Sequence, residues 1–383
     1  MYRATAVALA LLLALAGCST PEPEATTPPV AEPVETPRPT ATAEPVLITA
    51  PEPLLDVTCG EIAPDDTFSA LSTTALKAAD PRELADGEYA YGIPDWYPFA
   101  QLQSTQCQWH NDKPRYNENG AANDYSSLTL TALPNGHDAW AEYKDVYGTT
   151  EGFVGVSCNG ADRPNARCRY DGLLENGTWV NVTFEGMKNF GSNAKNVAKF
   201  KELLAQVSST LESASAGAVW AAPSDTLEIA TGCPSVVTAE DVATAVGGKA
   251  TNVIFNNDGI GGTGISREAR RLIGAEECRW FTTFAPSEYG LPYRVLAGGE
   301  WAWRSAREST EQFTTAVELP LDGLAEGDSA WIRNDGYILT ADLIVGRNWI
   351  AIDTYNDSFA SKSESKEALV KLAQLALNRV YGK

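Results

Sequence analysis

Cysteine is the residue type in this chain whose side chain can do the most chemistry, and there are seven cysteines. Cys18 follows an apolar segment near the N-terminus and is considered separately. The remaining six are an even number, which predicts three disulfide bonds in a protein outside the cytoplasm; they are Cys59, Cys107, Cys158, Cys168, Cys233 and Cys278. They contain no C-x-x-C pair, and the chain has only two histidines, His110 and His137. We therefore expect no metal site.

Residues 1–17 have the features of an export signal. Arg3 supplies positive charge, and the alanine- and leucine-rich run that follows is too short to span a bilayer. The segment Leu15-Ala16-Gly17-Cys18 resembles the lipobox of bacterial lipoproteins. That resemblance implies cleavage before Cys18 and attachment of diacylglycerol to its thiol. It places the mature chain on the outer face of the cytoplasmic membrane, anchored by lipid and exposed to the cell wall.

The next segment, residues 18–54, is rich in proline, glutamate, threonine and alanine. It has too few apolar residues to form a core, so we expect a semi-rigid tether. The whole chain has a net charge of −21. Binding to nucleic acid requires a basic surface, so we expect no nucleic-acid partner.

Aromatic residues gather in two further segments that contain glycine or proline. We expect these segments to be irregular and to line a pocket for an envelope ligand, because aromatic side chains form the walls of many small-molecule sites. The candidate ligand surface consists of Tyr91, Trp96, Tyr97, Trp301 and Trp303. Four other tryptophans recur at matched positions of a duplication described below, which favours core packing; they are Trp109, Trp179, Trp280 and Trp349.

Other motifs give no catalytic residues. Residues 259–264 read G-x-G-x-x-G, but a dinucleotide site also needs an acidic residue about twenty positions later. Glu276 and Glu277 come too early, so we expect a loop and no cofactor. Both histidines lie in the first half, which argues against a repeated Ser-His-Asp site. Carboxylate pairs cannot be singled out among fifty acidic residues.

The chain after the tether is an internal duplication. Each half has an early cysteine, then a Cys-x-Trp sequence at Cys107 or Cys278, and then strand-like segments. In the first half, Trp140 is matched by Trp301 or Trp303 of the second. Each half also has a late β-branched strand, residues 179–184 or 349–354, and a closing amphipathic helix. We expect an early helix at 65–71 and another that begins after Thr238.

This pattern predicts an α+β fold: two tandem copies of an antiparallel sheet covered by helices, each with a disulfide to its Cys-x-Trp sequence. The first repeat spans 55–215, a linker spans 216–226, and the second repeat spans 227–383. Repeat symmetry predicts the bonds Cys59–Cys107 and Cys233–Cys278. The two remaining cysteines, Cys158 and Cys168, are then expected to pair with each other.

The lipobox, the early cysteines, the Cys-x-Trp sequences and residues 321–331 together resemble actinobacterial cell-envelope lipoproteins with Cys-rich domains of unknown function. The extracytoplasmic sensor domains of some actinobacterial Ser/Thr kinases are similar. The resemblance implies PsbP-like α/β/α layering and an accessory or ligand-sensing role without catalysis.

We therefore expect a membrane-anchored extracytoplasmic lipoprotein that binds a ligand or acts as an envelope accessory protein. Its partners would be the membrane, through the Cys18 lipid, and an unidentified envelope lipid, glycan or protein. Two other hypotheses remain open at this point. One is a cell-wall hydrolase or transferase, and the other is a passive structural spacer.

Overall fold

The structure is a computed structural model that describes residues 49–64, 75–81, 92–114, 116–117, 120–121, 125–147, 155–159, 167–186, 194–231, 234–247, 250–255, 264–282, 291–355, 359 and 361–383. These residues all belong to one compact unit, Val46–Lys383. Several predicted features lie outside the described residues: the lipidated Cys18, Tyr91, Cys233, the helix at 65–71 and most of the glycine-rich segment at 259–264.

The first repeat is built on a six-stranded antiparallel sheet in the order β1-β2-β5-β8-β7-β6. Its strands are β1 (Lys77–Ala79), β2 (Thr105–His110), β5 (Ser127–Leu133), β6 (Gly155–Asn159), β7 (Arg167–Leu173) and β8 (Trp179–Glu185). A separate two-stranded sheet pairs β3 (Tyr116–Asn117) with β4 (Gly120–Ala121). The predicted late strand at 179–184 is confirmed as β8.

The second repeat is built on a seven-stranded antiparallel sheet in the order β12-β13-β14-β15-β11-β10-β9. Its strands are β9 (Ala250–Phe255), β10 (Cys278–Thr282), β11 (Leu291–Leu296), β12 (Val317–Glu318), β13 (Ser329–Asn334), β14 (Ile338–Val345) and β15 (Asn348–Tyr355). Read from β9, this order repeats that of the first sheet. The structure thus confirms the α+β fold and the duplication.

Helices cover both faces of each sheet. Trp179 and Val180 are neighbours on β8, so they point to opposite faces, and they belong to different apolar clusters. One face of the first sheet packs on α5 (Ala194–Ser213) and α1 (Cys59–Ile62), and the other packs on α4 (His137–Tyr147). The helix α5 is the closing helix predicted for this repeat, and its buried apolar stripe includes Phe200 and Val207.

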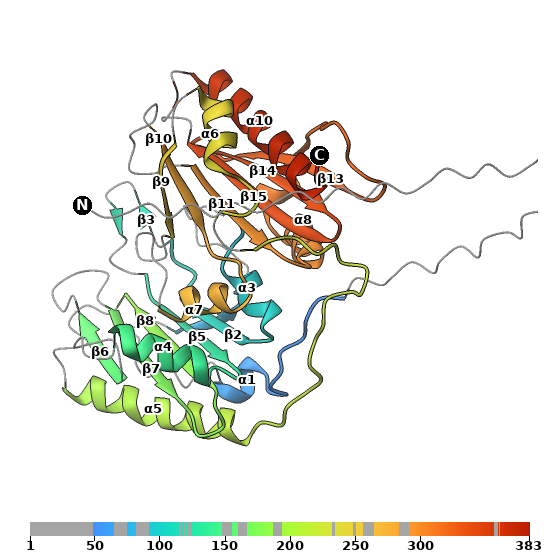
Figure 1. The fold of residues 1–383 in the computed structure, drawn as a ribbon. Coiled ribbons are helices and arrows are strands. Elements are labelled where there is room, and N and C mark those ends of the chain that lie inside the picture. The colour runs from blue at the N-terminus through green and yellow to red at the C-terminus, as the bar shows by residue number, and fades with distance from the viewer. Residues whose placement is uncertain are drawn as a thin grey trace, which may run out of the picture. The chain divides into compact units, whose positions relative to one another are not determined.

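The second sheet has the same layers. Figure 1 shows α10 (Lys362–Val380) and α6 (Ala239–Val246) over one face, and their apolar residues share a cluster with that sheet. The other face packs on α8 (Glu300–Ser309) and α9 (Glu311–Thr314). Thr238 caps α6 through a reciprocal capping box with Asp241, as the sequence predicted. Ser361 likewise caps α10 by accepting a hydrogen bond from the Glu364 N–H.

The repeats also exchange a helix. The helix α3 (Trp96–Gln101) comes from the first repeat, yet Tyr97 packs in a cluster with Trp301 and Trp349 of the second. In return, α7 (Gly264–Leu272) comes from the second repeat and places Ile265 in a cluster with Trp179 of the first. Each repeat therefore supplies part of the other's core.

Two predicted disulfides are confirmed, Cys59–Cys107 and Cys158–Cys168. Cys278 is also disulfide-bonded, while its predicted partner lies outside the described residues. All four matched tryptophans are buried. A further repeated contact was not predicted: the Trp179 indole donates to Asp171, 3.3 Å away, and the Trp349 indole donates to Asp342, 2.8 Å away.

Candidate functional site

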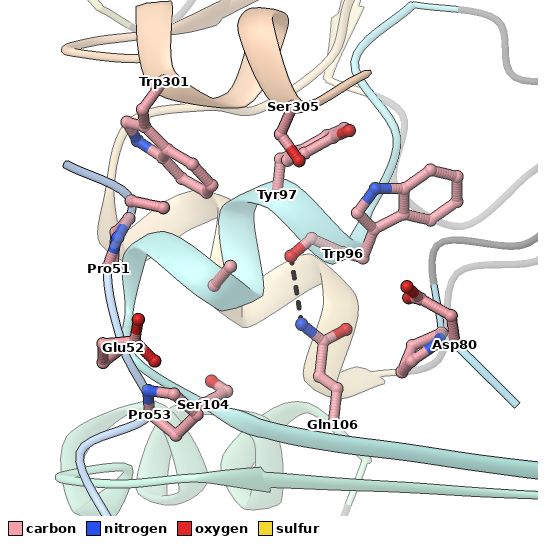
Figure 2. A pocket seen from close by; sticks show the side chains of 13 residues that line it. Pro51, Glu52, Pro53, Asp80, Trp96, Tyr97, Ser104, Gln106, Trp301 and Ser305 are labelled. Atoms are coloured by element: carbon pink, nitrogen blue, oxygen red, sulfur yellow. Dashed lines mark hydrogen bonds between the residues drawn. The ribbon is translucent and has the colours of Figure 1, made fainter. Parts of the chain in front are cut away.

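A cavity of about 410 Å³ brings the two predicted aromatic groups together. Trp96 and Tyr97 reach it from α3, and Trp301 reaches it from α8 (Figure 2). A third wall is formed by residues 50–53, which precede the first repeat. The volume and aromatic lining of the cavity are typical of sites for small molecules. We call it the aromatic cavity.

The three aromatic rings pack in tilted and edge-to-face arrangements. The centroids of Trp96 and Tyr97 are 5.6 Å apart with an interplanar angle of 51°, and those of Tyr97 and Trp301 are 5.8 Å apart at 70°. Tyr97 also packs on Trp349, with 5.6 Å between centroids. These separations are favourable for aromatic pairs, so the core of the second repeat holds the cavity wall in place.

The local structure of these aromatic residues corrects one prediction. The sequence predicted irregular segments, but Trp96 and Tyr97 lie on α3, and both tryptophans of the second group lie on α8. Pro98 lies in the first turn of α3, where a missing N–H is tolerated. Trp303 does not line the cavity. It is only 4% exposed, and its ring packs on that of Trp349 with 5.5 Å between centroids.

Several polar atoms in the cavity wall are buried without a partner. Among the described residues, no hydrogen-bond partner is present for Trp96 Nε1, Trp301 Nε1 or Ser104 Oγ. Trp301 is 6% exposed and Ser104 is 4% exposed. Leaving such a group unsatisfied costs about 1–3 kcal/mol. All three atoms are shielded from solvent, so they are enclosed within the wall of the cavity and do not open into its space.

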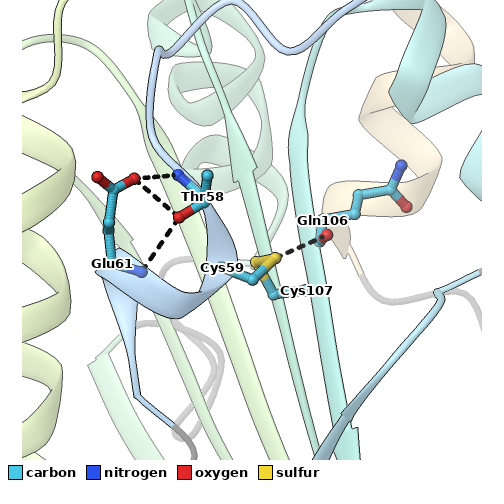
Figure 3. The surroundings of a disulfide bond; sticks show 5 residues. All are labelled: Thr58, Cys59, Glu61, Gln106 and Cys107. Carbon is cyan, nitrogen blue, oxygen red and sulfur yellow. Dashed lines mark hydrogen bonds between the residues drawn. A yellow bond between two sulfur atoms is a disulfide. The ribbon is translucent and has the colours of Figure 1, made fainter.

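Strand β2 forms the floor of the cavity through Gln106. The Gln106 side-chain amide donates to the Trp96 carbonyl oxygen over 3.0 Å, which ties the strand to α3. The next residue is Cys107, and its disulfide partner Cys59 has its sulfur 3.4 Å from the Gln106 carbonyl oxygen (Figure 3). The first disulfide therefore fixes the strand that carries this part of the site.

The N-terminal wall of the cavity is the end of the predicted tether. The Trp220 indole donates to the Thr49 carbonyl oxygen at 3.2 Å, and the Gln103 side chain donates to the Glu52 carbonyl oxygen at 3.0 Å. Gln103 has a φ of 54°, in the left-handed region that favours glycine. Its side-chain oxygen also accepts from the Trp220 backbone N–H at 2.7 Å. These bonds hold residues 49–54, which the sequence predicted to be part of the tether, against the first repeat and the linker.

Buried charges of the second sheet hold the chain that leads into α3. Arg333 donates to the Gly92 carbonyl oxygen at 3.0 Å, and Arg294 donates to the Ile93 carbonyl oxygen at 2.6 Å. The Gly92 N–H donates to an Asp353 carboxylate oxygen at 3.3 Å. We call these three bonds to Gly92 and Ile93 the α3 clamp. Its charged members lie on β11, β13 and β15, so the second repeat positions a helix of the first.

Asp353 of the α3 clamp and Glu277, which lies beside the clamp, have opposite pKa shifts. Burial raises the pKa of Asp353 to about 6, although a hydrogen bond from Thr340 and the charge of Arg333 act to lower it. Glu277, which pairs with Arg294 at 2.5 Å, is also buried. Burial acts to raise its pKa, but the neighbouring guanidinium groups hold that pKa below the ordinary value.

Two groups discussed from the sequence contribute nothing to the aromatic cavity. His137 begins α4 and is exposed, and His110 lies on β2 with Nδ1 3.3 Å from an Asp112 oxygen. In the described part of the chain, no three His, Cys, Asp or Glu side chains are grouped to hold a metal ion. In the same part, no helix is both long and apolar enough to cross a membrane.

Sequence reasoning found the aromatic members of the site but missed its polar members. Ser104, Gln106 and Gln103 are common residue types, and no local pattern distinguishes them. Their positions just before Cys107 are the signal that could have found them, because the disulfide places that strand beside α3. Comparison of the chain with known protein families, curated proteins and solved structures found no match.

Proposed function

We propose that this protein is a lipid-anchored extracytoplasmic binding protein, and that the aromatic cavity is its ligand site. The observation that carries the proposal is the cavity itself. It joins aromatic rings from both repeats, and its volume is typical of sites for small molecules. A passive spacer has no need for such a cavity.

The proposed anchor is consistent with the way the chain reaches the cavity. Cys18 precedes Thr49 by 31 positions, and the segment between them is proline-rich. At about 3.1 Å per residue, an extended proline-rich chain spans on the order of 100 Å. The described end of this segment is bonded to Trp220 and Gln103 beside the cavity. The tether therefore delivers the ligand site to the envelope at a limited distance from the membrane.

The anchor is tested by replacing the lipidated residue. We expect the Cys18→Ser protein to lose membrane association or to keep its signal peptide, because no thiol remains to carry the lipid. Membrane fractionation and mass spectrometry of the N-terminus measure both outcomes. Unchanged membrane association with a mature end elsewhere would contradict the proposed anchor.

The binding function is tested with residues 46–383, the compact unit that contains the whole cavity. This protein is tested for binding to purified envelope lipids, glycans and proteins. We expect at least one component to bind, and we expect Trp96→Ala to weaken that binding by tenfold or more. Trp331→Ala is the matched control, because Trp331 is a half-buried tryptophan on β13 that does not line the cavity.

Two results would contradict this function. One is a protein for which no envelope component shows binding that depends on Trp96. The other is turnover of a wall glycan, peptide or ester that disappears when a single Asp or Glu is replaced. The second result would establish the enzyme hypothesis instead.

A further inference from the structure

The described end of the tether lies on the protein as a bound peptide would. Residues 49–53, which we call the strap, read Thr-Ala-Pro-Glu-Pro, and residues 50–53 form one wall of the aromatic cavity. Proline fixes its own φ at about −65° and keeps the residue before it extended. Because Ala50 and Glu52 each precede a proline, the strap favours the extended polyproline II conformation.

Side chains of the protein bind the carbonyl groups of the strap. The Thr49 carbonyl oxygen accepts from the Trp220 indole N–H at 3.2 Å, and the Glu52 carbonyl oxygen accepts from the Gln103 side chain at 3.0 Å. A polyproline II helix has three residues per turn, so these two carbonyl groups lie on the same face of the strap. Pro51 is the buried member of the strap. Because proline has no N–H, its burial leaves no backbone donor unsatisfied.

Aromatic rings supply the apolar side of the contact. The Trp220 ring packs edge-to-face on that of Trp301, with 6.5 Å between centroids. Trp301 and Pro51 both line the aromatic cavity, and Figure 2 shows Pro51 on the same side of it as Trp301. Grooves lined by aromatic rings bind proline-rich peptides, because the polyproline II conformation is already formed and loses little entropy on binding. The strap therefore shows, within one chain, the chemistry of a proline-rich ligand.

The attachment of the chain changes at Leu54. The Leu54 N–H donates to the Gln103 carbonyl oxygen at 2.8 Å, and the Leu54 carbonyl oxygen accepts from the Gly217 N–H at 2.6 Å. These are bonds between backbone groups, whereas the bonds described for residues 49–53 come from side chains. The strap can therefore leave its place while the backbone bonds of Leu54 stay intact.

We propose that the surface under the strap binds a proline-rich segment of a partner protein, and that the strap occupies this surface as an internal competitor. The inference rests on the proposed binding function and names its ligand class. A segment that displaces the strap gains the same two carbonyl bonds and also reaches the aromatic cavity of about 410 Å³. The strap of a second copy would make only the contacts already present within one chain, so the additional space favours a different partner.

The test measures the binding of fluorescently labelled peptides to residues 46–383 by anisotropy. The probes are decaproline and a peptide of residues 49–53, and the control is the latter peptide with Pro51→Ala and Pro53→Ala. A linked strap has an effective concentration in the millimolar range and competes strongly with a free peptide. The protein variant Pro51→Gly with Pro53→Gly weakens the strap, so we expect it to bind both probes about tenfold or more tightly than the unaltered protein.

Further variants are made in this glycine variant to locate the bound peptide. Trp220→Phe keeps an aromatic ring but removes the N–H that bonds to the Thr49 carbonyl oxygen. We expect the dissociation constant for the peptide of residues 49–53 to rise by about two- to tenfold. Trp331→Phe is the matched control and leaves binding unchanged, because Trp331 is half-buried on β13 and does not line the cavity. Trp96→Ala should weaken decaproline more than the shorter peptide, and circular dichroism confirms that each variant is folded.

The outcomes distinguish this inference from the function on which it rests. If an envelope component binds in a Trp96-dependent way while both proline probes fail, the binding function stands and the peptide class is wrong. If neither an envelope component nor a proline probe binds, both proposals fail. The peptide class is also wrong if the control peptide binds as tightly as its proline parent, or if Trp220→Phe changes nothing.

Two further outcomes concern the strap and its replacement. Equal affinity of the glycine variant and the unaltered protein for both probes would show that the strap does not compete with the ligand. Size-exclusion chromatography of residues 46–383 tests for a second copy. A dimer that is lost in the glycine variant would show that the occupant is the strap of another copy, and the assignment to a partner protein would be wrong.

Discussion

The two exchanged helices, α3 and α7, occupy equivalent places in their repeats but make different contacts. Gln103 and Gly274 follow these helices with φ values of 54° and 65°, and each precedes its Cys-x-Trp cysteine by four positions. The following N–H closes the helix in the same way, from Ser104 to the Phe99 carbonyl oxygen and from Ala275 to the Arg270 carbonyl oxygen. The two helix ends therefore correspond residue by residue.

The contacts between each exchanged helix and its neighbour differ in their polar and aromatic members. With the same alignment, Arg267 and Glu268 of α7 stand where α3 has Trp96 and Tyr97. Arg271 then bridges Glu268 at 2.7 Å and Glu142 of α4 at 2.6 Å. Ion pairs join α7 to α4, whereas aromatic rings and a cavity lie between α3 and α8.

The partner helices differ in the same sense. The N–H of Trp140 bonds to the Gly136 carbonyl oxygen, and the N–H of Trp303 bonds to that of Gly299, so these tryptophans correspond. Trp301 then falls at the place of Asp138, an exposed residue. An exchanged helix can thus be held without an aromatic cavity. The cavity is an additional feature of one crossing, which favours a ligand there rather than a requirement of the fold.

The largest expected effects come from the tryptophans that pack against each of two helix crossings. One crossing is that of α3 with α8, and the other is that of α7 with α4. Trp179→Ala and Trp349→Ala should each destabilise the protein by about 3–5 kcal/mol, because both rings are fully buried and large core truncations leave cavities. Urea denaturation followed by circular dichroism measures the free energy of unfolding. Trp349 also packs on Tyr97, so its replacement should reduce ligand binding in the remaining folded protein.

The comparison of the two crossings fails if Trp179→Ala and Trp349→Ala change ligand affinity to the same extent. Trp179 packs on Trp140 and Tyr143, with 5.2 and 4.9 Å between centroids, beneath the crossing that has no aromatic cavity. Its replacement should therefore leave ligand affinity unchanged at an equal folded fraction. A loss of affinity as large as that of Trp349→Ala would show that the two crossings are not independent.

The sequence was sufficient to predict some of the elements within each repeat, although it missed the helices α3 and α8. Apolar spacing marked α5 and α10, Thr238 marked the start of α6, and the cysteine pattern chose the two described disulfides. These are local signals or signals that repeat. From the sequence, Trp140 could be matched either to Trp301 or to Trp303. Only the start of the helix α8 in the structure decides between them.

The helix exchange could not be predicted, because an apolar face does not specify which sheet it covers. Tyr97 reads the same whether α3 packs on its own repeat or on the other. The left-handed conformation at Gln103 was also not predicted, because glutamine rarely adopts it. In the second repeat, glycine occupies the matching position. The polar half of the site depends on both features.

The next effect concerns the bonds that hold α3. Burial gives Asp353 a pKa of about 6, above the unfolded value near 3.9. The folded protein therefore binds an extra proton between about pH 4 and pH 6, and this group lowers stability as the pH rises through that interval. Asp353→Asn removes the loss, so the variant should gain roughly 3 kcal/mol relative to the unaltered protein between pH 4 and pH 7.

Denaturation of both proteins across this pH range measures the difference. Glu277 has the opposite shift, and its contribution to stability grows as the pH rises, so it acts against the loss from Asp353 in the unaltered protein. A stability difference that does not change with pH would show that the α3 clamp does not titrate. Ligand affinity measured at pH 5 and pH 7 tells whether the same carboxylate also influences the cavity.

A smaller effect is expected at the start of α7. A methyl group on Gly264 would lie 2.0 Å from a ring carbon of Tyr143, so Gly264→Ala should destabilise the protein by about 1–3 kcal/mol. Gly60→Ala in α1 is the matched control, since a methyl group there meets nothing within 4 Å. Equal stability of the two variants would contradict the close packing of α7 on α4. If Gly264→Ala is destabilised as expected, the final glycine of the G-x-G-x-x-G sequence is needed for packing.

The smallest effect is expected from the ion pair that replaces the aromatic cavity in the first repeat. Glu142→Gln removes the charge that faces Arg271, but both side chains are partly exposed and Arg271 keeps its bond to Glu268. Partly exposed pairs contribute about 0.2–1 kcal/mol, and salt screens them. We therefore expect a loss of about 0.5 kcal/mol that shrinks at high salt, with ligand affinity unchanged. Denaturation at two salt concentrations and a titration with the bound envelope component measure both quantities. If this variant altered ligand affinity as strongly as Trp96→Ala does, ligand binding would not be confined to the crossing of α3 and α8.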